Sequence, residues 1–286
     1  MNRRIWLQSA LAASASAPLG LAVETNSGKS RLRSAICAYS FRTELQKKTM
    51  KYEDLVNLSV DLGVEGLDLT VYWFPSTDNS FLLPLRRLAY RSGVELYSIS
   101  VRSDLCKPDA AGQESELTSL KKWVDVAAKL GAGHIRVFGG TVPKGRTEDE
   151  AAGWVASILS RAAEYAGTQG VILGLENHGG ITLEADRIIQ IIKKVDSPWV
   201  AMNLDTGNFR DNSYAQIEKC IPFAANVQVK QNIRNNNATE PSDWKRIVAM
   251  LRKGGYKGYL ALEYEEKEPA PTAVPRLIGQ LQKIIA

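Results

Sequence analysis

Two kinds of apolar run alternate along the chain from residue 33 onward. Short apolar runs predict strands at 35–41, 64–71, 94–101, 133–139, 171–177, 199–205, 224–230 and 258–265. Longer runs with apolar residues three and four apart predict helices at 51–62, 79–92, 113–130, 147–169, 182–195, 213–221, 241–254 and 271–285. Glycines such as Gly63, Gly93 and Gly131 follow helical runs directly, where a left-handed residue commonly ends a helix. The pattern therefore predicts eight strand–helix units in series.

Strict alternation of strands and helices predicts a parallel sheet, which is either open or closed into a barrel. Eight units favour closure. No Gly-x-Gly-x-x-Gly motif follows the first strand, so the main support for a dinucleotide-binding fold is missing. We therefore predict an α/β protein with a single (β/α)8 TIM barrel over residues 33–286, whose active site lies at the carboxyl ends of the strands.

The N-terminal residues have the composition of an export signal. The pair Arg3–Arg4 precedes a modest apolar run at 11–22, which is too short and too rich in serine to span a bilayer stably. We expect a twin-arginine signal peptide at 1–22 and a flexible segment at 23–32. The mature protein is then periplasmic or extracellular, with no stable membrane insertion after the signal is removed. Loss of the two arginines lowers the formal net charge from +5 to +3.

Composition excludes several classes of partner. The body of the chain has no cluster of lysine and arginine interleaved with aromatic residues, so nucleic acid is not an expected partner. Cys37, Cys106 and Cys220 are odd in number and widely spaced, which is typical of neither a disulfide framework nor a metal cluster. At most one disulfide can form. A small polar molecule is the expected substrate.

The last four strands share a pattern in which one face is polar and the other apolar. Around the fifth strand, Glu176 and His178 lie on one face with Gly174, whereas Leu173 and Leu175 lie on the other. The same alternation gives the next three strands a polar face each, with the residues Asn203, Asp205, Gln228, Lys230, Glu263 and Glu265. The apolar faces should meet the helices. We therefore expect the polar faces to converge on the barrel axis, with Glu176, Asp205, Gln228 and Glu263 in a ring.

Three carboxylates in one low-dielectric space repel one another and lose solvation, which a cation or a shared proton must offset. A divalent metal ion is the simplest solution. Oxygen ligands from carboxylates and an amide suit hard cations, so we rank Mn²⁺ first, Mg²⁺ second and Zn²⁺ third.

Four motifs extend this interpretation to a family. They are Gly-Leu-Glu-Asn-His-Gly-Gly at 174–180, Asn-Leu-Asp-Thr-Gly-Asn at 203–208, Val-Gln-Val-Lys at 227–230 and Leu-Glu-Tyr-Glu at 262–265. With them, residues 33–286 resemble the xylose isomerase-like TIM-barrel superfamily, the sugar phosphate isomerase/epimerase group. The resemblance implies that Glu176, Asp205, Gln228 and Glu263 bind one divalent cation. It also implies that Glu176 and Glu263 act as the acid/base pair. Gln228 stands where the family more commonly has histidine.

The residues suggest a chemistry that agrees with this resemblance. A metal bridging a carbonyl and a neighbouring hydroxyl acidifies the adjacent C–H bond, and carboxylates on two sides can remove and return that proton. This is isomerase or epimerase chemistry. Candidate substrate-binding residues are His178, Lys230, Arg136, Asn208, Trp73 and Phe138. Trp73 and Phe138, near strand ends, are placed to stack on a sugar face.

Three alternatives remain open. A lyase or hydrolase of 3-keto-glycosides would use the same metal site and the same proton abstraction. A carbohydrate-binding barrel without catalysis and an abasic-site endonuclease are weaker alternatives, because both acid/base carboxylates are present and the histidine-rich cluster of the nuclease is not: the chain has two histidines. Exported compartments hold few phosphorylated sugars. We therefore expect a metal-dependent isomerase or epimerase of a non-phosphorylated sugar or keto-sugar.

Overall fold

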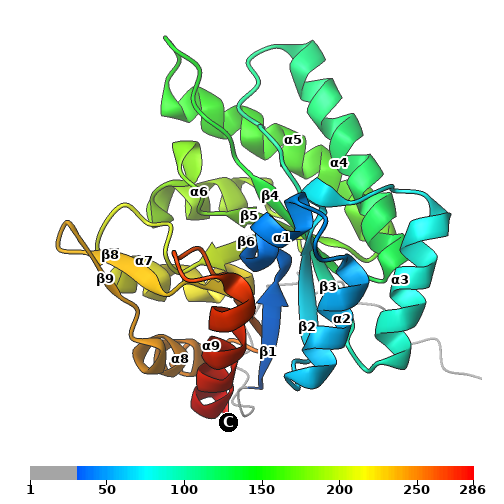
Figure 1. Cartoon of the computed structure of the whole chain (residues 1–286). Coiled ribbons are helices and arrows are strands. Elements are labelled where there is room, and N and C mark those ends of the chain that lie inside the picture. The colour runs from blue at the N-terminus through cyan, green and yellow to red at the C-terminus, as the bar shows by residue number, and fades with distance from the viewer. Residues whose placement is uncertain (1–30) are drawn as a thin grey trace, which may run out of the picture.

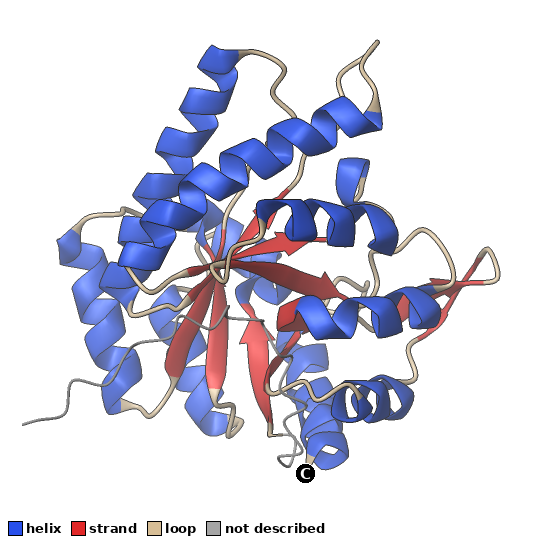
Figure 2. Cartoon of the chain, turned by 180° about the vertical axis from the view of Figure 1, so that it is seen from behind, coloured by secondary structure: helices blue, strands red, loops and turns tan. Residues whose placement is uncertain are grey.

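The computed structural model describes residues 31–286, so the predicted signal peptide lies outside the described residues. Eight parallel strands close into a barrel in the order β1-β10-β7-β6-β5-β4-β3-β2. Figures 1 and 2 show the strands at the centre and the helices around them. The barrel strands are β1 (Leu32–Cys37), β2 (Gly66–Thr70), β3 (Glu95–Ser100), β4 (His134–Phe138), β5 (Ile172–Glu176), β6 (Val200–Asp205), β7 (Ala224–Val229) and β10 (Gly258–Leu262). The predicted single TIM barrel is confirmed.

All eight predicted helices are present, and a short α1 precedes them. The helices are α1 (Arg42–Gln46), α2 (Tyr52–Asp61), α3 (Asn79–Arg91), α4 (Ala110–Leu130), α5 (Glu148–Thr168), α6 (Ala185–Val195), α7 (Ser213–Cys220), α8 (Trp244–Lys253) and α9 (Ala270–Ile285). Helix α5 begins with a capping box, in which Thr147 and Glu150 each bond the other's backbone N–H. The sequence pattern therefore located every barrel element, with differences at their ends.

The first predicted strand, 35–41, is partly wrong. Strand β1 ends at Cys37, and residues Ala38–Phe41 form a 3₁₀ turn over the mouth of the barrel. The Ser40 hydroxyl explains the turn, because it donates to the carbonyl oxygen of Leu262 at 3.0 Å and accepts from the N–H of Tyr264 at 2.9 Å. These bonds tie the end of β1 to the end of β10.

An antiparallel hairpin after β7 is the one sheet that the pattern did not predict. Strands β8 (Asn232–Asn235) and β9 (Ala238–Pro241) pair through a turn at Asn236 and Asn237, both with positive φ. Asparagine tolerates this conformation, as hairpin turns require. The strands β8 and β9 are mostly polar, so they lack the alternation of apolar residues that predicts a strand. In Figure 1 the hairpin lies beside α7, away from the barrel strands.

The core has two chemically different parts. The outward faces of the strands, such as Leu173 and Leu175, are fully buried in one apolar core with the helices. Each such side chain contributes about 1.5–3 kcal/mol by leaving water. The inward faces are largely polar. The apolar cluster on that side is small and comprises Ala35, Cys37 and Ala261. Polar side chains buried along the strands include Asp68, Ser98, Ser100, His134, Asn203, Asn226 and Gln228. The predicted convergence of polar faces on the axis is confirmed.

One close contact in the interior explains a glycine on β5. The His134 Nδ1 atom lies 2.8 Å from the Ser98 hydroxyl. A Cβ atom on Gly174 would lie 2.0 Å from His134 Nε2, so the imidazole occupies the space that the glycine leaves. Burial, with a smaller effect of the Arg136 charge, lowers the pKa of His134 from 6.5 to about 3.

Two expectations about the described residues can be compared with the structure. None of the helices in residues 31–286 is both long and apolar enough to cross a bilayer. Cys37, Cys106 and Cys220 are all buried and free.

Candidate functional site

Glu176 is the last residue of β5, and its side chain is buried at the mouth of the barrel. One carboxylate oxygen, Oε2, lies 2.9 Å from Arg136 Nε, and the other accepts a hydrogen bond from Asn208 Nδ2 at 3.0 Å. Burial raises the pKa of Glu176 well above the usual carboxyl range, while Arg136 opposes that shift. Asp205 and Glu263 add to the rise. Glu176 is thus a carboxyl group suited to holding and releasing a proton.

Arg136 is held on β4 by several fixed contacts. Its Nη1 donates to the carbonyl oxygen of Val101 and to the hydroxyl of Tyr72, both at 3.1 Å. The guanidinium lies 4.0 Å from the centre of the Phe138 ring, a cation–π distance. These contacts orient the guanidinium edge toward Glu176.

Lys230 follows β7 and gathers three carboxylates around its ammonium group. Its Nζ lies 3.4 Å from Asp205 Oδ2 and 3.3 Å from Glu263 Oε1, and it donates a short hydrogen bond to Glu265. Burial raises the pKa of Asp205 to about 7, although Lys230 lowers it. Attraction to these carboxylates outweighs the opposite effect of burial and raises the pKa of Lys230 well above its ordinary value. Lys230 is therefore a charged ammonium inside the site.

Hydrogen bonds fix both the backbone and the carboxylate of Asp205. The side chain of Asn177 donates to the Asp205 carbonyl oxygen at 2.8 Å and accepts from its N–H at 2.9 Å. The other carboxylate oxygen, Oδ1, accepts from the N–H of Gly207 at 2.8 Å. The Asn177 of one motif thus positions the Asp205 of the next.

Gln228 lies beside Asp205 in the sheet register, but its amide bonds to other residues. Its oxygen accepts from Asn203 Nδ2 at 2.7 Å, and its nitrogen donates to Asp68 Oδ2 at 3.0 Å. Within residues 31–286, no group of three or more His, Cys, Asp or Glu side chains is arranged to hold a metal ion. The structure therefore pairs Glu176 with Arg136, and Asp205 and Glu263 with Lys230.

The remaining predicted residues line the rim of the mouth. The rings of Phe138 and His178 lie 4.1 Å apart between centres, beside a hollow of 320 Å³ that both residues line. Trp73 stacks on Tyr39 at 5.9 Å and lines a separate hollow of 560 Å³ with Phe74. The aromatic residues thus border two different hollows.

The sequence pattern missed Tyr39, Tyr72 and Asp68, and it placed Glu265 on an inward face without giving it a role. A signal existed for Asp68, because Gly66, Asp68 and Thr70 form a polar face on β2 like the faces used for the later strands. The tyrosines gave no such signal, since they lie in the turns that follow β1 and β2.

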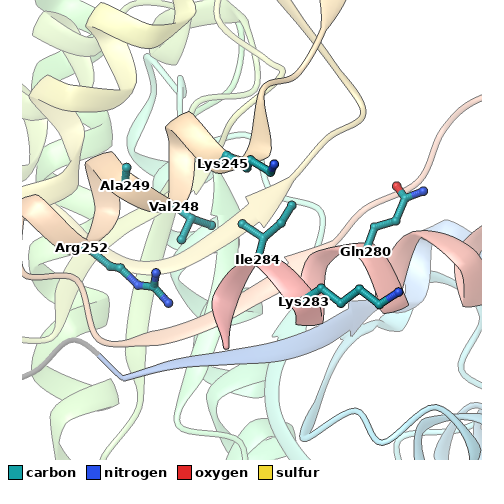
Figure 3. A pocket seen from close by; sticks show the side chains of 7 residues that line it. All are labelled: Lys245, Val248, Ala249, Arg252, Gln280, Lys283 and Ile284. Carbon is teal, nitrogen blue, oxygen red and sulfur yellow. The ribbon is translucent and has the colours of Figure 1, made fainter.

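A groove of 920 Å³ lies elsewhere, between α8 and α9 on the outer helix layer. Figure 3 shows its side chains, among them Lys245, Arg252 and Lys283, which come from these two helices. No carboxylate lines it. It has no group suited to proton transfer, so the mouth of the barrel remains the candidate site.

The sequence of residues 56–284 matches the family model described as xylose isomerase-like TIM barrel. The chain belongs to this family. The match covers most of the barrel, including all four site-bearing strand ends, and confirms the resemblance carried by the four motifs. A comparison with curated protein sequences found no match.

Several solved structures are similar to this chain in fold. A D-psicose 3-epimerase with D-tagatose from Clostridium cellulolyticum H10 has a TM-score of 0.71 and 16% identity, with 88% of this chain and 96% of that one covered. An IolI protein with a bound zinc atom has a TM-score of 0.73, 13% identity and coverage of 88% and 96%. A probable 3-DHS dehydratase, AsbF, from Bacillus anthracis has a TM-score of 0.65, 14% identity and coverage of 88% and 98%. At these identities the likeness shows the fold.

Proposed function

We propose that this xylose isomerase-like protein is a carbohydrate isomerase or epimerase that moves a proton next to a carbonyl group. The observation that carries the proposal is the placement of Glu176 and Glu263 at the ends of β5 and β10, which β6 and β7 separate in the barrel. Each carboxylate lies beside a fixed cation, Arg136 or Lys230. Two carboxyl groups on different sides of one mouth can remove and return a proton.

Relatives such as the zinc-bound IolI protein support the expectation that this fold holds a divalent cation. The donor atoms of this chain do not fit one. Glu176 Oε2 and Asp205 Oδ2 accept no hydrogen bond, which alone would suit metal ligands. Each of these oxygens, however, already forms an ion pair with a protein cation, Arg136 or Lys230, within 3.4 Å. The Gln228 oxygen already accepts a hydrogen bond. Manganese, ranked first because of the oxygen donors, stays a prediction.

The protein's own residues can carry out the proton transfers. One carboxylate takes the proton from the carbon beside the carbonyl. The electron pair of that C–H bond becomes a C=C bond, and the π electrons of the carbonyl move onto its oxygen. The resulting negative charge needs nearby positive charge, which Lys230 and Arg136 supply in a water-poor site. Return of the proton to the other face of the same carbon gives an epimer. Protonation of the former carbonyl carbon, with transfer of the neighbouring hydroxyl proton to the oxyanion, gives an isomer with a new carbonyl group.

Arg136 and Asn208 position Glu176 for this task. Together they hold both of its carboxylate oxygens, so its remaining freedom is small. The raised pKa of Glu176 lets this carboxyl keep a proton to higher pH than an ordinary carboxyl does, which favours its use as an acid as well as a base. Glu176 is thus suited to serve as acid and as base.

The substrate class follows from the rim and from the predicted export. Trp73 lines one hollow and the Phe138–His178 pair lines another, and aromatic rings at such positions can pack against a sugar. The twin-arginine segment favours a compartment with few sugar phosphates. The substrate is therefore a non-phosphorylated sugar or keto-sugar.

A second candidate is an elimination from a keto-glycoside. The similar dehydratase AsbF favours it, because loss of water also begins with proton abstraction beside a carbonyl in many substrates. Here the electron pair would expel the group on the next carbon instead of taking up a proton.

A panel of free sugars, keto-sugars and 3-keto-glycosides incubated with the mature protein distinguishes these functions. Product NMR is expected to show an isomer or epimer of equal mass for one sugar. Release of the aglycone would favour the lyase, and binding without conversion of any compound would contradict catalysis.

A further inference from the structure

The ammonium group of Lys230 lies between two carboxylates that the family resemblance names as metal ligands, Asp205 and Glu263. Lys230 Nζ lies within 3.4 Å of Asp205 and of Glu263, on two different strand ends. We propose that Lys230 is the resident cation of this site and that the enzyme works without a bound divalent metal. The proposal rests on the proposed function for its chemistry, but its charge assignment can be tested separately.

Two backbone hydrogen bonds and the space beside Gly207 hold Lys230 in position, and we call these contacts its seat. The Lys230 N–H donates to Thr206 Oγ1 at 3.0 Å, and its carbonyl oxygen accepts from Trp244 Nε1 at 2.9 Å. A Cβ atom on Gly207 would lie 2.6 Å from Lys230 Cγ and 2.8 Å from its Cβ, so the missing side chain of Gly207 makes room for the lysine stem. Asp205, Thr206 and Gly207 thus supply an ion-pair partner, a hydrogen bond and space in consecutive positions.

The fourth predicted ligand has another role. Gln228 bridges Asn203 and Asp68 through its oxygen and nitrogen, and Asp68 is also held by the Ser100 hydroxyl at 2.8 Å. Binding a metal through the Gln228 oxygen would compete with the Asn203 bond. An amide in such a network is a structural link between β2, β6 and β7.

A divalent ion and this ammonium group would compete for the same oxygens. Metal ions bind carboxylate oxygens at about 2.0–2.6 Å. An ion at that distance from both Asp205 and Glu263 would lie close to Lys230 Nζ and be repelled by it. Since burial and the seat hold Lys230 in place, the lysine excludes the metal.

The ammonium group can supply positive charge to a substrate oxygen in this site. Of its three carboxylate contacts, the one to Glu265 has the geometry of a hydrogen bond, and those to Asp205 and Glu263 are longer ion pairs. N–H groups of Lys230 therefore remain to donate to the substrate's carbonyl oxygen. When a carboxylate removes the neighbouring proton, the C–H electron pair becomes the new C=C bond and the carbonyl electrons become an oxyanion. Lys230 stabilises that oxyanion until the proton returns, and no oxidant or reductant is needed.

Calorimetric titration of chelator-treated mature protein with Mn²⁺ tests the charge assignment. The wild type is expected to show no stoichiometric binding, whereas Lys230→Met, which exposes the carboxylates, binds Mn²⁺ at least tenfold more tightly. Lys257→Met, which removes an exposed lysine, is the matched control and should behave as the wild type. Gly207→Ala, which disturbs the lysine stem, should also increase Mn²⁺ binding if Lys230→Met does not fold. Binding of one Mn²⁺ per wild-type chain would overturn the proposal.

Proton exchange of a sugar substrate in D₂O separates this proposal from the proposed function. Exchange by the chelated wild type at its full rate supports both. Exchange that disappears on chelation and returns with Mn²⁺ would overturn the role of Lys230 and leave the proposed function standing. No exchange with any sugar, together with no Mn²⁺ binding, would contradict the proposed function while supporting the lysine as resident cation.

Discussion

His134 should make the protein lose stability as the pH falls from about 6.5 toward 3. In the folded protein burial lowers the pKa of His134 to about 3, whereas the unfolded chain has the ordinary value of 6.5. Between these values the unfolded state binds a proton that the folded state does not. Stability therefore rises with pH across this window and is lost on acidification.

The magnitude follows from the two pKa values. At about pH 4.5 the unfolded chain is favoured roughly a hundredfold by protonation of this one residue, which corresponds to about 2–3 kcal/mol. Urea unfolding at about pH 7 and about pH 4.5, followed by circular dichroism, measures it in the wild type and in His134→Gln. Glu176 and Asp205, whose pKa values are raised, oppose the trend, so the difference between the two proteins is the quantity to compare.

The variant removes the titrating ring, so its loss of stability on acidification should be smaller than that of the wild type by about 2–3 kcal/mol. His178→Gln, which removes the exposed histidine of the rim, is the control and should change the difference less. Identical pH dependence in the wild type and in His134→Gln would refute the assignment of a neutral, buried imidazole.

The acid/base pair and the interior contact give two further predictions. Glu176→Gln and Glu263→Gln should each lower turnover by about 10² or more with an unchanged circular dichroism spectrum, and rates within about tenfold of wild type in both would rule out their roles. Gly174→Ala should destabilise the protein by about 1–3 kcal/mol, because the added methyl meets His134 at 2.0 Å; a melting temperature equal to that of the wild type would contradict that packing.

The fold could be predicted because its signals are local. Apolar spacing within each segment marks a strand or a helix, and the period of two assigned Glu176, Asp205 and Glu263 to inward faces before any tertiary contact was known. The hairpin β8–β9 escaped because its strands are polar. The end of β1 was misjudged because Ser40 bonds to Leu262 and Tyr264, more than two hundred residues later.

The partners of the site residues could not be predicted from the same pattern. The Gln228–Asp68 bond joins residues 160 positions apart, and it decides whether the amide faces a ligand or a neighbour. The seat of Lys230 depends on the contact of its stem with Gly207, which the register of β6 and β7 determines. Periodicity gives the face of a side chain, but charge pairing depends on which strand ends meet.

Deuterium incorporation from D₂O into the sugar that the panel identifies is the most direct test of proton abstraction at this mouth. We predict that the wild type introduces deuterium at one carbon next to the carbonyl and that Glu176→Gln/Glu263→Gln introduces none. Conversion of the sugar without any deuterium, or undiminished incorporation by the double variant, would contradict the account.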